Sequence, residues 1–433
     1  MADYDIHVHH LTRVEGHGDV VLKVKDNKVD SVAFNVVEAP RFFEAMLVGR
    51  AHYEVREIVT RICGICACGH ALSSIRASEA AMSIEPSEQT VDFRKLVLHG
   101  ENLSSHYLHY YFLAAPDFLG VGSVLPLASS HPDVVVRALK LKKLGNDLSE
   151  AFVGRHVHPI SMKLKGFTKL PDAANLKSIQ ARLVDSIKDI EATIELFKTL
   201  KVPDYTRETE YVSLGPINGS KEYPFYDGNI ITSGGESLPP LKYTEITNEV
   251  THPDHTAKLC AHNGKPYQVG ALARFNNNYK LLRPEAQKAA QQLGIQPVCH
   301  NPYMITIAQI VETVHITYDA IDLISKCLNR GLIDEPIEYK VKAGTGAGAV
   351  EVPRGILFHG YTYDNNGYIT KADCVIPTTQ NVSNINEDFK AFVPSMLGKP
   401  ENEISLLLQM LVRAYDPCIS CSAHLLDVRI DRE

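Results

Sequence analysis

Four cysteines in this sequence stand in two Cys-x-x-Cys motifs, Cys63 with Cys66 and Cys418 with Cys421. Such a motif brings two thiolates close enough to share one metal ion, so two motifs supply four soft ligands. Four thiolates suit a structural zinc ion, and a single motif also suits a thiol-disulfide enzyme whose thiolate has a lowered pKa. These chemistries are all open at this point.

The two motifs lie at opposite ends of a 433-residue chain. A zinc ribbon normally closes within a few dozen residues, whereas this site has to be assembled by the whole fold. Assembly from distant segments is typical of catalytic centres. The spacing therefore favours a catalytic metal centre over a local zinc site.

Composition restricts the partners and the compartment. The chain has 45% hydrophobic and 22% charged residues, as in globular proteins, and a net charge of -7 without a long basic block. We expect no nucleic acid partner. The N-terminus lacks a secretion signal, and no apolar window is long enough for a direct membrane span. We expect a soluble, cytoplasmic protein, where paired cysteines serve metal or redox chemistry.

Hydrophobic periodicity predicts an α+β fold that is mainly α. We expect one large domain over 1–433, with long amphipathic helices in its middle and loops with short strands over 202–267. The Gly-rich stretch 344–348 is interpreted as a flexible turn. The predicted parts are an N-terminal β-hairpin region at about 1–50, a helical core at about 51–335, a β-rich segment at about 337–381, and a C-terminal helix with the ligand motif at about 400–433.

Both cysteine pairs carry similar extensions. The first runs from Arg61 to His70 and the second from Asp416 to His424. With them the chain resembles the large, catalytic subunit of nickel-iron hydrogenases, most of all the cytoplasmic NAD(P)-linked and sulfhydrogenase branch. Other segments resemble that family in its order, so the likeness spans nearly the whole chain: 13–17, 40–44, 352–355 and 376–381. It implies the family's fold, a central bundle of long helices with small mixed α/β parts.

The resemblance implies a nickel ion held by four thiolates. Cys63 and Cys418 would be terminal ligands, while Cys66 and Cys421 would bridge to an iron that carries carbon monoxide and two cyanides. The implied reaction is the reversible heterolytic cleavage of dihydrogen into a proton and a hydride. Dihydrogen is a very weak acid, so its cleavage needs a Lewis-acidic metal pair and a nearby base.

The resemblance also implies which residues transfer the proton and which residue supplies a positive charge near the metals. The Cys418 thiolate would be the base, and Glu15 would carry the proton onward, because a carboxyl group can both accept and donate. Arg354 would point its guanidinium at the metals and polarise bound dihydrogen. The alternative is that Arg354 simply pairs with a buried acid such as Asp416. Ser105 stands where respiratory members have an aspartate, so Asp416 is the expected acid partner.

Further residues would surround the centre. Thr378, next to Pro377, resembles the hydroxyl residue that hydrogen-bonds an iron cyanide; taken by itself it would be an ordinary strand threonine. His70 is expected to orient a bridging cysteine sulfur by a hydrogen bond. Glu44 and His424 match positions where the family holds a magnesium or iron ion.

Partners follow from the same resemblance. This chain has no spare cysteine cluster for iron and sulfur, so an iron-sulfur small subunit has to carry electrons away, and flavin and iron-sulfur subunits would pass them to NAD(P). Alternatives are a deazaflavin, heterodisulfide reductase or sulfur as the acceptor, or a structural zinc protein. The family's maturation endopeptidase usually cuts after the histidine matching His424, so the tail 425–433 implies either an uncut precursor or a branch that keeps it.

Overall fold

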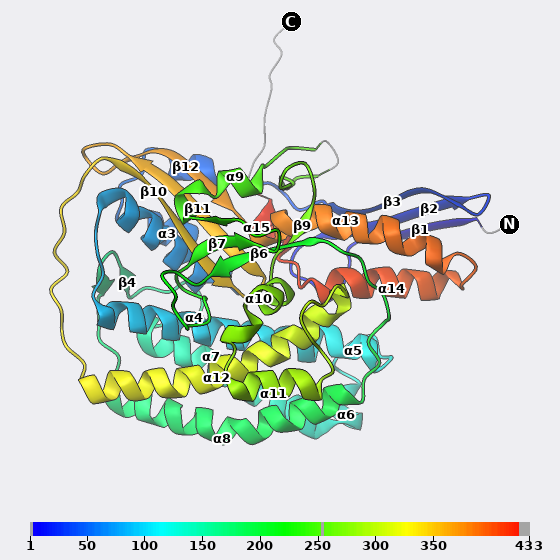
Figure 1. The fold of residues 1–433 in the computed structure, drawn as a ribbon, viewed down its shortest axis with the longest axis horizontal. Helices are drawn as coiled ribbons and strands as arrows, with labels where there is room; N and C mark the ends of the chain where they lie inside the picture. The colour runs from blue at the N-terminus through cyan, green and yellow to red at the C-terminus, as the bar shows by residue number, and fades with distance from the viewer. Residues whose placement is uncertain (1–2, 253–254, 424–433) are drawn as a thin grey trace, which may run out of the picture.

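Four long helices form a bundle in the lower half of Figure 1. The computed structural model describes residues 3–252 and 255–423. α8 follows the predicted amphipathic pattern, because its buried apolar residues recur at three- and four-residue spacing and face the bundle interior. α12 is buried on all sides over residues 305–317 and keeps this spacing only beyond them, at Ala320, Ile324 and Cys327. The four are α4 (Glu88–Leu108), α7 (Pro132–Val153), α8 (Ala173–Lys198) and α12 (Ile305–Arg330).

Glycines let α4 and α7 approach each other closely. A Cβ atom on Gly100 would lie 2.6 Å from the backbone nitrogen of Ser149, and one on Gly145 would lie 2.6 Å from that of Ser104. Both distances are shorter than van der Waals contact, so neither helix tolerates a side chain at this crossing.

The upper half contains α3 (Ala67–Met82) against an antiparallel sheet of β10 (Gly344–Val352), β11 (Gly355–Tyr363) and β12 (Ile369–Val375) (Figure 1). The prediction of a flexible turn at 344–348 is wrong, because this stretch is the first half of β10. Gly344, Gly346 and Gly348 alternate toward α3, and a Cβ on any of them would lie within 2.3 Å of an α3 carbonyl oxygen. The glycines are therefore needed for backbone-to-backbone packing.

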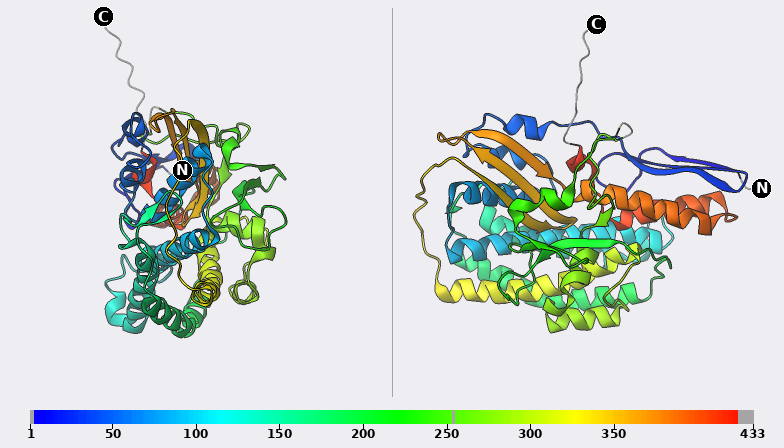
Figure 2. Two further views of the ribbon diagram at one scale, coloured as in Figure 1. Left: turned by 90° about the vertical axis from the view of Figure 1, so that its left-hand side faces the viewer. Right: turned by 45° about the horizontal axis from the view of Figure 1, so that its top comes forward.

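The N-terminal sheet has the order β1 (Tyr4–Val8), β2 (Gly18–Lys25), β3 (Lys28–Val36), as the predicted hairpin requires. It extends beyond the helical body, beside α13 (Pro377–Met396) and α14 (Glu401–Ala414) (Figures 1 and 2). Asn386 on α13 accepts a hydrogen bond from the Phe34 amide at 2.7 Å, which attaches the sheet to the helix.

The predicted β-rich segment ends earlier than expected, because residues 377–381 belong to α13. Pro377 occupies the first turn of this helix, where its missing N–H costs nothing. Short elements link the larger ones, as predicted for 202–267. They are α1 (Phe43–Leu47), α2 (Val55–Val59), α5 (Ala115–Phe118), α6 (Leu127–Ser130), α9 (Thr244–Thr247), α10 (Ala271–Asn278), α11 (Pro284–Gln292), α15 (Ile419–Ser422), β4 (Met162–Lys163), β5 (Gly166–Phe167), β6 (Glu210–Gly215), β7 (Asn229–Thr232), β8 (Ser237–Leu238) and β9 (Tyr267–Gln268).

A buried ion cluster connects the bundle to the upper sheet. Arg274 on α10 donates to Glu312 on α12 at 2.6 Å and to Glu351 on β10 at 2.9 Å. His106 on α4 hydrogen-bonds Glu312 as well, at 2.9 Å. All four side chains are buried, so each charge depends on the others for solvation. The cluster fixes β10, and with it the position of Arg354 just beyond that strand.

Candidate metal centre

The two cysteine motifs meet at one place in the fold. Cys63 lies in the loop after α2, and Cys66 is the residue before the first turn of α3. Cys418 precedes the one-turn helix α15, which carries Cys421. Each cysteine pair therefore lies at the start of a helix. The backbone turn within each pair places both sulfur atoms on the same side, toward the other pair.

The four sulfur atoms form a single buried cluster. Their Sγ atoms all lie within 4.8 Å of one another, with 3.4 Å between Cys63 and Cys418 and 2.6 Å between Cys418 and Cys421. All four cysteines are unpaired by disulfides and nearly inaccessible to solvent. The structure thus brings together the four predicted ligands.

Thiol ionisation in this cluster depends on a cation. Hydrogen bonds from Cys418, Cys421 and Cys66 hold the pKa of the Cys63 thiol well below its ordinary value. Burial raises the pKa values of Cys418 and Cys421 well above theirs, and the neighbouring sulfurs contribute. Burial and the neighbouring sulfurs thus oppose a cluster of four thiolates, and a metal cation bound here would offset that cost. This donor set fits a transition-metal centre with soft ligands.

Arg354 supplies a permanent positive charge beside the sulfurs. Its Nε donates to the Asp416 carbonyl oxygen at 2.6 Å, and its Nη2 donates to the Asp416 carboxylate at 2.9 Å. Nη1 is buried and has no hydrogen-bond partner among the described residues. Burial alone would lower the pKa of Arg354, but Asp416 and the cysteines raise it above the ordinary value. The pair with Asp416 is present as expected, and it leaves one guanidinium nitrogen for a further anionic group.

Glu15 hydrogen-bonds the sulfur cluster and is itself less buried than the cysteines. Cys418 Sγ donates to Glu15 Oε2 at 3.1 Å, and the Ser420 amide donates to the same oxygen at 3.1 Å. The Ser420 hydroxyl donates to Oε1. Glu15 itself is half-buried, while Cys418 is buried. A carboxyl group in this position can take a proton from the thiol and present it nearer to solvent.

Thr378 lies in the first turn of α13, not in a strand. Its Oγ1 accepts a hydrogen bond from the Cys418 amide at 2.9 Å. Because that bond uses a lone pair of the oxygen, the O–H proton remains available to an acceptor in the site. The neighbouring Pro377 is buried and starts the helix.

His70 makes a different contact from the one predicted. Its Nδ1 hydrogen-bonds Nε2 of His359 at 3.0 Å, and its Nε2 has no hydrogen-bond partner within the described ranges. The expected hydrogen bond to a cysteine sulfur is thus not formed. Burial lowers the pKa of His70 to about 4, so the ring is neutral.

Glu44 is surrounded by charged groups. Its Oε1 accepts from the Cys374 amide at 3.0 Å and from Lys258 at 3.1 Å. Lys258 also pairs with Glu249 at 2.8 Å and Asp373 at 3.6 Å. Three carboxylates around one ammonium leave an excess of negative charge, and burial raises the pKa values of Glu44 and Glu249. An oxygen-liganded divalent cation fits such a place.

The other residue predicted for that ion, His424, lies outside the described residues. The tail 425–433 lies outside them too. The magnesium or iron site at Glu44 and His424 therefore stays a prediction.

Two residues of the site had no predicted role. Arg41 donates through Nη2 to the Ile62 carbonyl at 2.6 Å and to the Ser420 carbonyl, so it links the two cysteine loops. Glu101 on α4 accepts from the Cys68 and Gly69 amides at 2.7 and 2.9 Å and caps the start of α3. Both side chains hydrogen-bond backbone groups of distant segments, and no sequence motif predicts such a contact.

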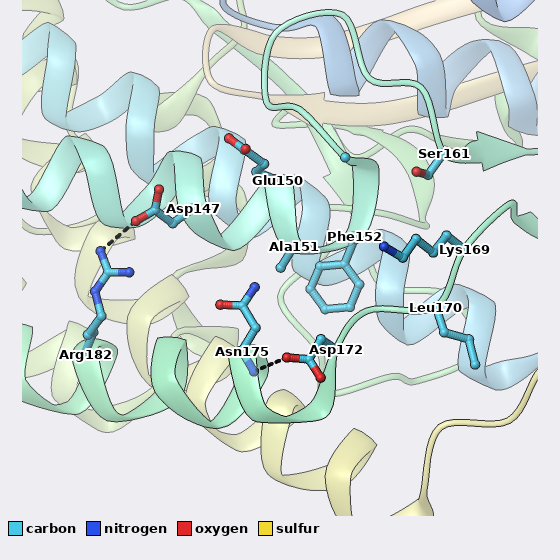
Figure 3. Close-up of a pocket in the computed structure, with 11 residues that line it drawn as sticks. Asp147, Glu150, Ala151, Phe152, Ser161, Lys169, Leu170, Asp172, Asn175 and Arg182 are labelled. Carbon is cyan, nitrogen blue, oxygen red and sulfur yellow. Dashed lines mark hydrogen bonds and ion pairs between the residues drawn. The ribbon is translucent and has the colours of Figure 1, made fainter.

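A surface pocket elsewhere on the molecule is not part of this centre. It lies between the end of α7 and the start of α8, where Asp147 pairs with Arg182 and Asp172 caps α8 (Figure 3). No predicted site residue and no cysteine is among the residues that line it.

Comparisons with known proteins agree with the geometry of the cysteine site. The chain matches the nickel-dependent hydrogenase family over residues 41–138 and 217–424, and a HoxL-like family over 5–39. It is 33% identical to the alpha chain of sulfhydrogenase 1 of Pyrococcus furiosus over 97% of each chain. It is 31% identical to one chain of the F420-non-reducing hydrogenase of Methanothermobacter marburgensis, over 96% of this chain and 94% of that one.

The fold agrees as well. An NAD+-reducing [NiFe]-hydrogenase in the H2-reduced state superposes with a TM-score of 0.88 at 26% identity, over 98% of this chain and 100% of that one. The chain belongs to the nickel-dependent hydrogenase family, as a large subunit. It is an oxidoreductase that acts on hydrogen. No helix in the described part of the chain is both long and apolar enough to cross a membrane.

Proposed function

We propose that this chain cleaves and forms dihydrogen at a nickel-iron centre held by Cys63, Cys66, Cys418 and Cys421, with carbon monoxide and cyanide ligands on the iron. The observation that carries the proposal is the buried four-sulfur cluster with a carboxyl group hydrogen-bonded to one of its members. When bound, the nickel-iron group supplies the Lewis acidity that makes dihydrogen acidic enough to split.

Three side chains have separate tasks in this proposal. Cys418 Sγ takes the proton released from dihydrogen and passes it to Glu15 Oε2, 3.1 Å away. The Ser420 amide and hydroxyl hold the Glu15 carboxylate in place for this transfer. Arg354, with one guanidinium nitrogen that has no partner among the described residues, contributes a fixed positive charge in a dry site, where electrostatic stabilisation is strong.

The surroundings position the ligands. The Thr378 hydroxyl proton is free to bond an iron cyanide, while its oxygen holds the Cys418 amide. Glu44 would hold a magnesium or iron ion together with His424, near the excess negative charge around Lys258. His70, neutral and buried, packs close to the cysteine loop without bonding its sulfurs.

For the electron acceptor we propose NAD(P), reached through an iron-sulfur small subunit with flavin-containing subunits beyond it. The likeness to an NAD+-reducing hydrogenase supports it. A second candidate is a sulfur or heterodisulfide acceptor, and the likeness to a sulfhydrogenase favours sulfur. The likeness to an F420-non-reducing hydrogenase gives no support to a deazaflavin such as F420 as the acceptor. Comparing hydrogen-dependent reduction of NAD+, NADP+ and these other acceptors by the purified complex discriminates between them.

Infrared spectroscopy with nickel and iron analysis, on the complex purified without oxygen, tests the metal assignment. Metal-bound carbon monoxide and cyanide absorb where protein does not. Such bands in a complex that also contains nickel support the proposal, and total iron exceeds nickel because the iron-sulfur subunits add their own iron. Zinc with a blank spectrum would overturn it in favour of a structural zinc site, and iron bands without nickel would identify an unprocessed precursor that still carries the tail 425–433.

A further inference from the structure

A second group of metal-ligating side chains lies on the N-terminal sheet, outside the cysteine site. In the pairing of β1 with β2, His7 is opposite Val21 and Val8 is opposite Val20. Continuing that register by one residue puts His9 opposite Asp19. Alternate residues of a strand point to the same face, so His7, His9 and Asp19 share one side of the sheet.

The three side chains already converge. Nδ1 of His9 lies 3.3 Å from Asp19 Oδ2, and Nε2 of His7 lies 3.8 Å from the same oxygen. The ligand atoms of all three lie within 4.8 Å of one another, and the two ring centroids are 3.6 Å apart. The His10 amide donates to the other carboxylate oxygen, Oδ1, at 3.1 Å and so fixes the aspartate. The cluster is an oriented set of donors rather than a chance gathering of side chains.

This donor set has a specific chemistry. Two imidazole nitrogens and one carboxylate oxygen suit borderline divalent ions such as zinc, with the remaining positions open to water. Ligand atoms about 2 Å from a tetrahedral zinc ion lie roughly 3.3 Å from each other. The distance from His9 Nδ1 to Asp19 Oδ2, 3.3 Å, has this value. The distance from His7 Nε2 to the same oxygen is longer, 3.8 Å, and the His7 side chain, 42% exposed, has room to rotate closer.

An ion pair explains the arrangement less well. A carboxylate paired with one imidazole gives no reason for a second imidazole ring to lie with its centroid 3.6 Å from the first. A metal ion binds both rings in the neutral form and satisfies the carboxylate as well.

We propose that His7, His9 and Asp19 bind one divalent cation of the zinc class at the surface of the N-terminal sheet. β1 is an edge strand of this sheet, paired only with β2 among the described strands. A cation held by residues at the end of β1 and the start of β2 fastens that edge. The site therefore serves to anchor the N-terminal strand and takes no part in the reaction at the cysteines.

Equilibrium dialysis of the purified complex against zinc chloride tests the proposal. We expect one zinc per chain beyond the metals already bound, with imidazole scattering and no sulfur ligand in zinc X-ray absorption. His9→Asn and Asp19→Asn each raise the dissociation constant at least about tenfold. His10→Asn is the matched control, because its ring is not in the cluster and its φ of 55° is one that asparagine tolerates. This variant binds zinc as the wild type does.

Hydrogen exchange of the β1 amides provides a second readout. Zinc should slow the exchange of residues 4–8 in the wild type and leave it unchanged in His9→Asn. Zinc coordinated by sulfur, equal binding by wild type and His9→Asn, or loss of binding in His10→Asn would each overturn the proposal. Hydrogenase activity does not enter any of these measurements, so their outcome is independent of the function proposed above.

Discussion

Replacing Glu15 by glutamine tests the proton path most directly. Glutamine has nearly the same shape and keeps a carbonyl oxygen for the Ser420 amide, so the loop that carries Cys418 should stay in place. It cannot carry a proton at the position 3.1 Å from the sulfur. We expect Glu15→Gln to retain both metals and to lose turnover.

The size of the loss follows from the role. A positioned general acid-base group contributes about a hundredfold to ten-thousandfold in rate. At about 1.4 kcal/mol for each factor of ten, this is roughly 3–5 kcal/mol of barrier. The assay is hydrogen-deuterium exchange per nickel, with the infrared bands recorded on the same sample.

Two variants serve as controls. Glu38→Gln makes the same chemical change at a half-buried glutamate that bonds His17 and does not contact the cysteines, and it should leave exchange unchanged. Ser420→Ala removes the hydroxyl donor to Glu15 but keeps the amide and the carboxyl group, so we expect a smaller loss than for Glu15→Gln. If Glu15→Gln keeps the wild-type exchange rate with its metals loaded, the relay role is wrong.

Three further predictions concern the ligands and the packing. Cys418→Ser replaces a soft ligand by a hydroxyl that ionises with difficulty, so nickel should be absent from the purified protein by metal analysis. Glu312→Gln removes one of the two carboxylates that pair with the buried Arg274 and should lower the free energy of unfolding by about 3 kcal/mol in denaturant titrations. Gly346→Ala forces a methyl group against α3 and should cost about 1–3 kcal/mol with reduced nickel content.

A matched substitution accompanies each of these. Cys299→Ser changes an isolated, half-buried cysteine and should keep nickel. Glu88→Gln removes an exposed ion pair with Lys326, which solvent screens, and should cost much less stability than Glu312→Gln. Gly122→Ala adds a methyl group where no atom lies within 4 Å and should be neutral. Equal nickel content in the two cysteine variants would contradict the ligand role of Cys418, and equal stability losses in either of the other pairs would contradict the burial argument for that pair.

Glu312 also gives the stability a definite pH dependence. Burial opposes its ionisation, but Arg274 and His106 hold its pKa at about 2, below the ordinary 4.5. A carboxyl group with a depressed pKa stabilises the fold above its unfolded pKa. This contribution, roughly 3 kcal/mol, is lost as pH falls from about 4.5 toward 2. The Glu312→Gln variant should lack this decline, which denaturant midpoints over that range would reveal.

The sequence predicted the parts of the site that depend on side-chain chemistry. Two cysteine pairs too far apart for a local zinc site indicated a centre built by the whole fold, and the four sulfurs do converge. The motif around Glu15 indicated a carboxyl group beside Cys418, and the hydrogen bond between them is present. Apolar spacing likewise predicted α8 and α12; α8 turns its apolar residues to the bundle interior, whereas the first half of α12 is buried on all sides.

The failures have physical reasons. Alternating glycines at 344–348 resemble a turn, but here they are the residues that allow β10 to contact α3. His70 was expected to bond sulfur and instead pairs with His359, a partner 289 positions away that no local pattern indicates. Arg41 and Glu101 bind backbone groups, and any residue type supplies those. Of the features of the site and fold, tertiary contacts to backbone atoms were the ones that sequence patterns predicted least well.

The separation of the two cysteine pairs has a consequence for how the chain comes apart. Cys63 and Cys418 are 355 positions apart, so a metal held by both pairs closes nearly the entire chain into a ring. The entropy that an unfolded chain loses on ring closure grows with ring length, so a metal that stayed bound to both pairs would restrict the denatured chain as well as serve the chemistry. The second pair is also synthesised last. Until the second pair has been synthesised, only two of the four cysteine ligands exist. The ring is then still open, and the site would be accessible to proteins that insert the metals.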